Sequence, residues 1–366
     1  MDKLNYHMMV LARLSRGLTQ EELAERACVG QGTLSKYETG IKEPTPESIQ
    51  KIASALEYPE KFFYQPGQLY GFPPFHYRKR KKLSVKTLGR IVAEMNIRRM
   101  HVSKLMISYE ITPLKSIPEI DLDEFQGRSA LRPAIEEIAR SIREMWMLGT
   151  GPISNMVEVI ENHGGVVIPC DFGTDLLDAI SQRIDGMPVL FFVNTNAPAD
   201  RVRHTLAHEL AHMLIHTTTI KDGDEMEREA EEFAGAFLLP RDEIMPQLRN
   251  FDLRHLANLK LFWKVSMSAI AVRADRLNLI TPYQNKMFWI EMGRLGYRKR
   301  EPNELPKEHP SLLRKMIEYH HHGLGYVSKD MAELLCMSVP EYNAMYGQES
   351  IAIKEETKSG HLRRVK

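Results

Sequence analysis

The stretch His208-Glu209-Leu210-Ala211-His212 limits the possible folds of this chain more than any other feature. It lies within a run from Arg201 to His216 in which apolar residues recur at helical spacing, at Leu206, Leu210, Ala211 and Leu214. On a helix, His208 and His212 lie one turn apart on the same face, so both imidazoles can reach a single Zn²⁺. Glu209 lies beside them and points toward the water that such a metal would bind. The sequence therefore predicts a helix that carries a catalytic zinc site.

A third ligand is expected from the helix that follows, because a catalytic zinc site has three protein ligands and leaves a fourth position to water. This predicted helix has an apolar face formed by Met226, Ala230, Phe233, Ala234 and Phe237. Glu229 is three residues from Met226 and four from Phe233, so it projects inward with them. Glu227 and Glu231 lie further from that face. We therefore expect Glu229 to be the third ligand.

Two further histidines lie on the same predicted helix as the motif. His216 is the second candidate for the third ligand, but it shares a helix with His212 and cannot easily complete a tetrahedron unless that helix bends. His204 is also at helical spacing, and we expect it to be a hydrogen-bond partner or a packing residue.

The first 66 residues predict several short helices separated by tight turns. Thr19-Gln20-Glu21-Glu22 has the form of a capping box, and the helix before it ends at Gly17. A helix-length segment from Gln31 to Glu38 is followed by a stop at Gly40. Thr45-Pro46 then begins another helix, with Thr as the cap and Pro at the first helical position.

This pattern resembles the XRE family, the five-helix, helix-turn-helix fold of phage repressors and lambda Cro. The resemblance depends on Leu18-Thr19-Gln20-Glu21-Glu22-Leu23-Ala24, on Thr33-Leu34-Ser35-Lys36-Tyr37-Glu38-Thr39-Gly40 and on Pro44. It implies that the chain binds a double-stranded DNA operator, with the second motif helix in the major groove and the first facing phosphate. It also implies that Gln20 contacts the DNA backbone and that the residues facing bases or phosphates are Gln31, Gly32, Thr33 and Lys36. Since Gly32 offers no hydrogen bond to a base edge, we expect weak sequence readout or readout by its neighbours.

A strongly basic segment follows this domain. Residues 1–66 contain eight basic and nine acidic residues, whereas the segment from Arg78 to Met100 contains nine basic residues and one acidic residue, Glu94. The basic segment either supplies affinity for phosphate, contacts an acidic protein, or forms a solvated linker. Apolar residues at helical spacing between Leu83 and Met106 predict an amphipathic helix. That helix either packs against its own chain or forms a homodimer that grips two operator half-sites.

The middle of the chain resembles the ImmA/IrrE family of metallopeptidases over about residues 130–282. The resemblance depends on Arg203 to His212, on Glu229-Ala230-Glu231-Glu232-Phe233-Ala234 and on Leu238-Leu239-Pro240. Members are zinc endopeptidases that cleave or inactivate XRE-type repressors, which implies a protein substrate in stress, mobile-element or phage-related control. The family implies that Zn²⁺ is held by His208, His212 and Glu229, and that Glu209 takes the water proton and gives it to the leaving amine. Glu231 stands where members commonly have Asn, which alters the surroundings of the ligands.

We expect a mainly α-helical protein with a small β-sheet, an α+β fold. Strands are predicted at residues 165–168, 179–184 and 189–194. The expected order is a helix-turn-helix domain at 1–66, a basic linker with an amphipathic helix at 67–129, and a peptidase domain at 130–245. A helical, helix-turn-helix-like region at 246–350 and a polar tail at 351–366 follow. His320-His321-His322 could bind metal adventitiously, but we expect an exposed loop cluster instead.

Composition excludes several other classes of protein. Apolar residues make up 43% of the chain and charged residues 27%, which is typical of a packed globular protein. The longest strongly apolar stretch, Val189 to Val193, is far shorter than the roughly 20 residues of a membrane helix. The N-terminus lacks the features of a secretory signal, and the three isolated cysteines fit neither a disulfide framework nor a cysteine zinc site. We therefore expect a cytoplasmic protein with no membrane part.

Three functions are compatible with these features. The first is a DNA-binding regulator with an active zinc endopeptidase domain, which acts on a repressor-type protein, on another protein or on itself. The second is a non-catalytic repressor or antitoxin in which the zinc-binding fold is a sensor or a dimerisation scaffold. The third is a peptidase whose helix-turn-helix domain recognises only its protein substrate. The presence of a general base, Glu209, favours an enzyme, because a scaffold does not need one.

Overall fold

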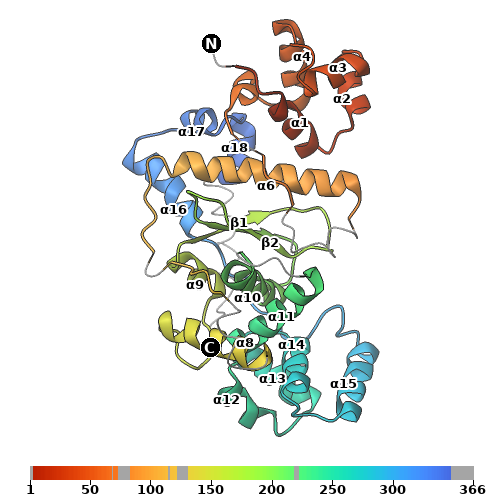
Figure 1. Ribbon diagram of the computed structural model, residues 1–366, viewed down its shortest axis with the longest axis vertical. Helices are drawn as coiled ribbons and strands as arrows, with labels where there is room; N and C mark the ends of the chain where they lie inside the picture. The colour runs from red at the N-terminus through yellow and green to blue at the C-terminus, as the bar shows by residue number, and fades with distance from the viewer. Residues whose placement is uncertain are drawn as a thin grey trace, which may run out of the picture. The chain divides into compact units, whose positions relative to one another are not determined.

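The computed structural model describes residues 3–67, 69–72, 83–113, 116–121, 131–217 and 222–347. Arg78 to Lys82 of the basic segment and the expected polar tail lie outside these residues. The described part is mainly helical with a three-stranded sheet, which confirms the expected α+β class (Figure 1). None of the described helices is long and apolar enough to cross a membrane.

The chain forms two compact units, and each is built from separate stretches of sequence. The first unit contains residues 1–71, 84–111 and 312–366, and the second contains residues 72–83 and 112–311. This division differs from the consecutive regions that we expected. The C-terminal helices belong to the same unit as the N-terminal helices, because their side chains bond to that part of the chain.

The first unit begins with the predicted short helices. They are α1 (Tyr6–Ser15), α2 (Gln20–Arg26), α3 (Gln31–Glu38), α4 (Pro46–Leu56) and the 3-10 helix η1 (Glu60–Tyr64). The capping box at Thr19 is present, since the Thr19 hydroxyl accepts from the Glu22 amide and the Glu22 carboxylate accepts from the Thr19 amide. Thr45 caps α4 in front of Pro46. Local sequence therefore determines where these helices start.

A long helix and four C-terminal elements complete the first unit. They are α6 (Val85–Leu105), α16 (Leu312–Glu318), the π-helical turn η4 (Tyr319–Gly323), α17 (Ser328–Leu335) and α18 (Val339–Tyr346). The amphipathic helix predicted between Leu83 and Met106 is α6, and it adds Ala93, Ile97 and Met100 to the apolar core of the first helices. Arg16 donates two hydrogen bonds to the Glu341 carboxylate, at 2.8 and 3.1 Å.

The second unit contains the sheet. Its strands β1 (Gly165–Cys170), β2 (Ala179–Gln182) and β3 (Val189–Asn194) confirm the three predicted strands. Their order is β1-β3-β2, with β3 parallel to β1 and antiparallel to β2. Every residue of the central strand β3 is buried, which explains its continuous apolar sequence. β2 is an edge strand of this sheet and contacts α10 (Ala199–Ile215).

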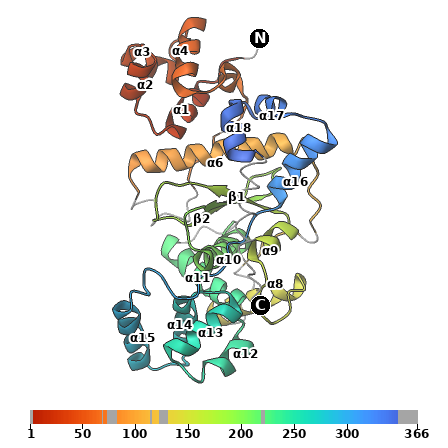
Figure 2. The ribbon, with the colours of Figure 1, turned by 180° about the vertical axis from the view of Figure 1, so that it is seen from behind.

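In Figure 2 the helices of the second unit lie on one side of its sheet. They are α8 (Leu131–Met145), α9 (Met156–Asn162), α10, α11 (Gly223–Leu238), α12 (Arg241–Ile244), the 3-10 helix η3 (Met245–Leu248), α13 (Leu253–Trp263), α14 (Met267–Arg276) and α15 (Pro282–Arg294). Trp263 and Ile270 are buried in the same core as residues of the sheet and of α10. Ile244 and Leu248 also lie in this core, so it continues past residue 245, where one region was expected to end.

The three consecutive histidines do not form the exposed loop cluster that we expected. His320 is 1% exposed, and its Nδ1 lies 2.8 Å from the Met316 carbonyl oxygen. His321 lies 2.6 Å from the Tyr326 carbonyl oxygen through Nδ1 and 2.7 Å from the Tyr342 hydroxyl through Nε2. The π-helical turn directs these two rings into the unit, which the sequence pattern alone did not indicate.

Candidate metal centre and nucleic-acid interface

His208 and His212 converge on one point, as their spacing predicted. Both lie on α10 and are buried, and their Nε2 atoms are 3.2 Å apart. Two nitrogens on a tetrahedral zinc lie about 3.3–3.4 Å apart when each Zn–N bond is about 2.0–2.1 Å. The separation of the two rings therefore fits a shared zinc ion.

The carboxylate that meets these two rings belongs to Glu227 on α11. Its Oε2 lies 3.7 Å from His208 Nε2, and its Oε1 lies 3.7 Å from His212 Nε2. One ligand atom from each of the three residues lies within 4.8 Å of the others. Two imidazoles and a carboxylate are a donor set typical of catalytic zinc. The group His208, His212 and Glu227 thus fits the metal that the sequence predicted.

Glu229, which we expected as the third ligand, lies elsewhere. It is 1% exposed, so the prediction that it projects inward is confirmed. Its Oε2 lies 2.8 Å from Nε2 of His216, however, and the structure groups Glu227 with the two motif histidines instead. The apolar periodicity of α11 identified the most buried carboxylate, whereas the carboxylate that contacts the Nε2 atoms of both motif histidines, Glu227, is a less buried one on the same helix.

Glu209 is held by a strand residue that sequence reasoning missed. Its side chain is 0% exposed, and its Oε2 accepts hydrogen bonds from the Ser181 amide at 2.9 Å and the Ser181 hydroxyl at 2.8 Å. Ser181 lies on β2, next to α10. The only sequence signal was a small polar residue within an apolar strand.

Glu231 lies close to two of the histidines. Its Oε2 is 3.4 Å from His208 Nδ1, and its Oε1 is 3.6 Å from His204 Nε2. Burial opposes ionisation of Glu231, but the hydrogen bond from His208 and the charges of His204, His208 and Arg276 outweigh it and lower its pKa to about 2. Glu231 is therefore an ionised acceptor that can orient His208 from the ring nitrogen opposite Glu227.

The predicted DNA-facing residues of the first unit lie on or next to α3. Gln31, Gly32 and Lys36 are exposed, while Leu34 and Tyr37 anchor the other side of the helix in the core. Thr33 is half-buried. A Cβ at Gly32 would meet no atom within 4 Å, so the absence of a side chain there is not required by packing.

A hydrogen-bond chain connects the α3 surface to the interior. Gln31 Nε2 donates to Gln20 Oε1 at 3.2 Å, and Gln20 Nε2 donates to Glu38 Oε2 at 2.8 Å. Glu38 in turn accepts from Arg13 Nε at 2.6 Å and Nη2 at 2.8 Å, and both side chains are buried. Two residues expected to contact DNA are therefore positioned by a buried ion pair.

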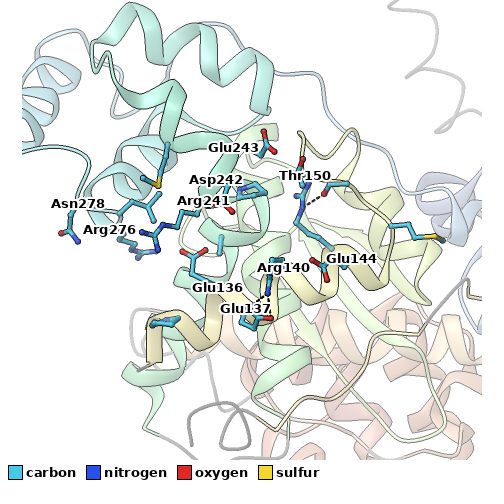
Figure 3. A pocket seen from close by; sticks show the side chains of 18 residues that line it. Glu136, Glu137, Arg140, Glu144, Thr150, Arg241, Asp242, Glu243, Arg276 and Asn278 are labelled. Carbon is cyan, nitrogen blue, oxygen red and sulfur yellow. Dashed lines mark hydrogen bonds and ion pairs between the residues drawn. The ribbon is translucent and has the colours of Figure 1, made fainter. Parts of the chain in front are cut away.

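A cavity of about 890 Å³ in the second unit is separate from the metal group (Figure 3). It lies between α8, α12 and the end of α14, and its lining includes neither the motif histidines nor Glu209. Arg140 donates to Glu137, and Arg143 donates to the Gly149 carbonyl, so these cations are already bonded within the protein. We do not assign this cavity to the candidate site.

Comparisons with known proteins match the two parts of the chain separately. Residues 11–63 match the family model described as helix-turn-helix, and residues 160–275 match the model described as IrrE N-terminal-like domain. The chain is also similar to the transcriptional regulator ClgR of Mycobacterium tuberculosis, from strains CDC 1551 / Oshkosh and ATCC 25618 / H37Rv. Each is 44% identical over 48 residues, which is 13% of this chain and 43% of the relative. The match thus spans less than half the length of these relatives.

Proposed function

The chain combines an XRE-type helix-turn-helix domain with an IrrE/ImmA-like domain of a peptidase family, and from this premise we propose that it is a DNA-binding transcription regulator with zinc-dependent endopeptidase activity. The observation that carries the proposal is the convergence of His208, His212 and Glu227 next to the helix position of Glu209. We propose that the substrate is a repressor-type protein or the chain itself.

The proposed zinc site gives each residue a separate task. His208, His212 and Glu227 would hold the Zn²⁺, which when bound would supply Lewis-acid chemistry and lower the pKa of the attacking water. Glu209 accepts the proton from that water and passes it to the leaving amine. Ser181 keeps the Glu209 carboxylate in one orientation through its amide and hydroxyl.

Replacing Glu227 tests the zinc ligands. We expect about one zinc per wild-type chain and a large loss of zinc in Glu227→Gln, because a neutral amide is a poor zinc ligand. Elemental analysis of protein purified without a metal-binding tag measures this content. Glu225→Gln, on the same helix but outside the metal group, is the matched control and should keep its zinc. If wild type binds no zinc even after incubation with it, the peptidase proposal is wrong.

Replacing residues on α3 tests DNA recognition. Lys36→Ala should weaken binding to all sequences and reduce the slope of log affinity against log salt by about 1, because one phosphate contact is lost. Gln31→Ala should relax base preference by about 1–3 kcal/mol at the position that it contacts. Sequences selected from random duplex DNA by the wild-type chain supply the probe.

A lysine on another helix controls for general charge effects in this experiment. Lys51 on α4 is an exposed cation paired with Glu47, and Lys51→Ala should bind DNA like wild type. Absence of DNA binding by wild type would instead support a helix-turn-helix domain that recognises only a protein.

A further inference from the structure

Three buried side chains form a continuous line that ends at the proposed zinc site. Glu229 Oε2 lies 2.8 Å from His216 Nε2, and His216 Nδ1 lies 2.8 Å from His212 Nδ1. The side chains of all three are 0% exposed. The other ring nitrogen of His212, Nε2, faces His208 and Glu227.

For an ionised Glu229 and a neutral His216, the two contacts of this line allow one arrangement of protons. An ionised carboxylate can only accept, so His216 must donate to Glu229 through Nε2–H. In a neutral His216, Nδ1 then has no proton and accepts from His212 Nδ1–H. That leaves the lone pair of His212 on Nε2, the nitrogen that faces the metal group. The line thus selects the tautomer of His212 that can ligate zinc.

We propose that Glu229 and His216 are positioning residues that hold His212 as a zinc ligand, and that neither binds the metal itself. This inference rests on the proposed zinc site. Glu231 stands in a comparable place behind His208, where its Oε2 lies 3.4 Å from Nδ1. A carboxylate therefore lies on the Nδ1 side of each motif histidine. Glu231 contacts His208 itself, whereas Glu229 is connected to His212 through the His216 ring.

Zinc affinity tests the inference independently of catalysis. Loss of such a supporting partner weakens metal binding by about 10–100-fold. Glu229→Leu removes the acceptor of the His216 Nε2–H group and should therefore bind one zinc with affinity reduced by that factor. Competition with a chromophoric chelator on the full chain measures the affinity. Glu225→Leu is the matched control on the same helix and should bind zinc with wild-type affinity. Wild-type affinity in Glu229→Leu would overturn the proposal.

The visible spectrum of the Co²⁺-loaded protein separates a positioning residue from a ligand. Glu229→Gln should keep the wild-type band positions, because the ligand set is unchanged. Glu227→Gln should shift them, because a ligand is lost. If Glu229→Gln shifts the bands as Glu227→Gln does, Glu229 is a ligand and the proposal is wrong.

A third measurement needs no variant. Nitrogen NMR of zinc-free wild type labelled with ¹⁵N-histidine reports the tautomer of each ring. We expect His212 to be protonated on Nδ1, and protonation on Nε2 alone would contradict the proposal. If wild type binds no zinc, the proposed function is wrong. The His212 tautomer still tests whether Glu229 and His216 position this ring. If zinc binds as expected but no peptide is cleaved, the positioning role stands and the peptidase activity does not.

Discussion

Glu209→Gln is expected to reduce peptide-bond hydrolysis by about 10²–10⁴-fold, the usual contribution of a general acid–base group. Glutamine has nearly the same shape as glutamate, and its carbonyl oxygen can still accept from the Ser181 amide and hydroxyl, which lie 2.9 and 2.8 Å from Glu209. It cannot accept the proton of the attacking water. Because Glu209 is not in the metal group, the zinc content should stay at the wild-type value.

A mixture of peptides derived from a whole proteome is a suitable substrate, since cleavage sites can be identified by mass spectrometry. Zinc content measured on the same samples separates loss of the base from loss of the metal. Equal cleavage by wild type and Glu209→Gln would show that Glu209 is not the base. Zinc and DNA binding by a wild type that cleaves nothing would favour the non-catalytic regulator.

Glu38→Gln is expected to destabilise the helix-turn-helix domain by about 3–5 kcal/mol, because it leaves the buried guanidinium of Arg13 without its opposite charge. The pair is bidentate, and the Glu38 side chain is only 3% exposed. Glu38 also accepts from Gln20, so the variant should lose DNA affinity as well.

Hydrogen exchange of the amides in α1, α2 and α3 measures this loss within the full chain. Glu47→Gln is the matched control, because it removes a carboxylate from an exposed ion pair with Lys51 on α4. We expect no detectable change in amide exchange in Glu47→Gln. Exchange in Glu38→Gln at the wild-type rate would mean that the buried pair adds no net stability.

Much of the fold follows from short-range patterns. The capping box at Thr19, the Thr45-Pro46 start and the apolar strand at Val189 depend on neighbours in sequence, and each predicted element is present. The convergence of His208 and His212 is of the same kind, because their separation of one turn is a property of the helix itself. These features could therefore be predicted without the tertiary structure.

The sequence by itself determined that α10 presents two histidines on one face and that α11 carries nearby carboxylates. Only the tertiary structure decided that Glu227 is the carboxylate within 3.7 Å of both Nε2 atoms, and that Glu229 contacts His216 instead. It also decided that the described residues 312–347 belong to the same unit as the N-terminal helices. The choice of carboxylate and the placement of the C-terminal helices have the same physical reason, because each depends on how elements distant in sequence pack against one another. The periodicity of one helix contains no information about the rotation of its neighbour.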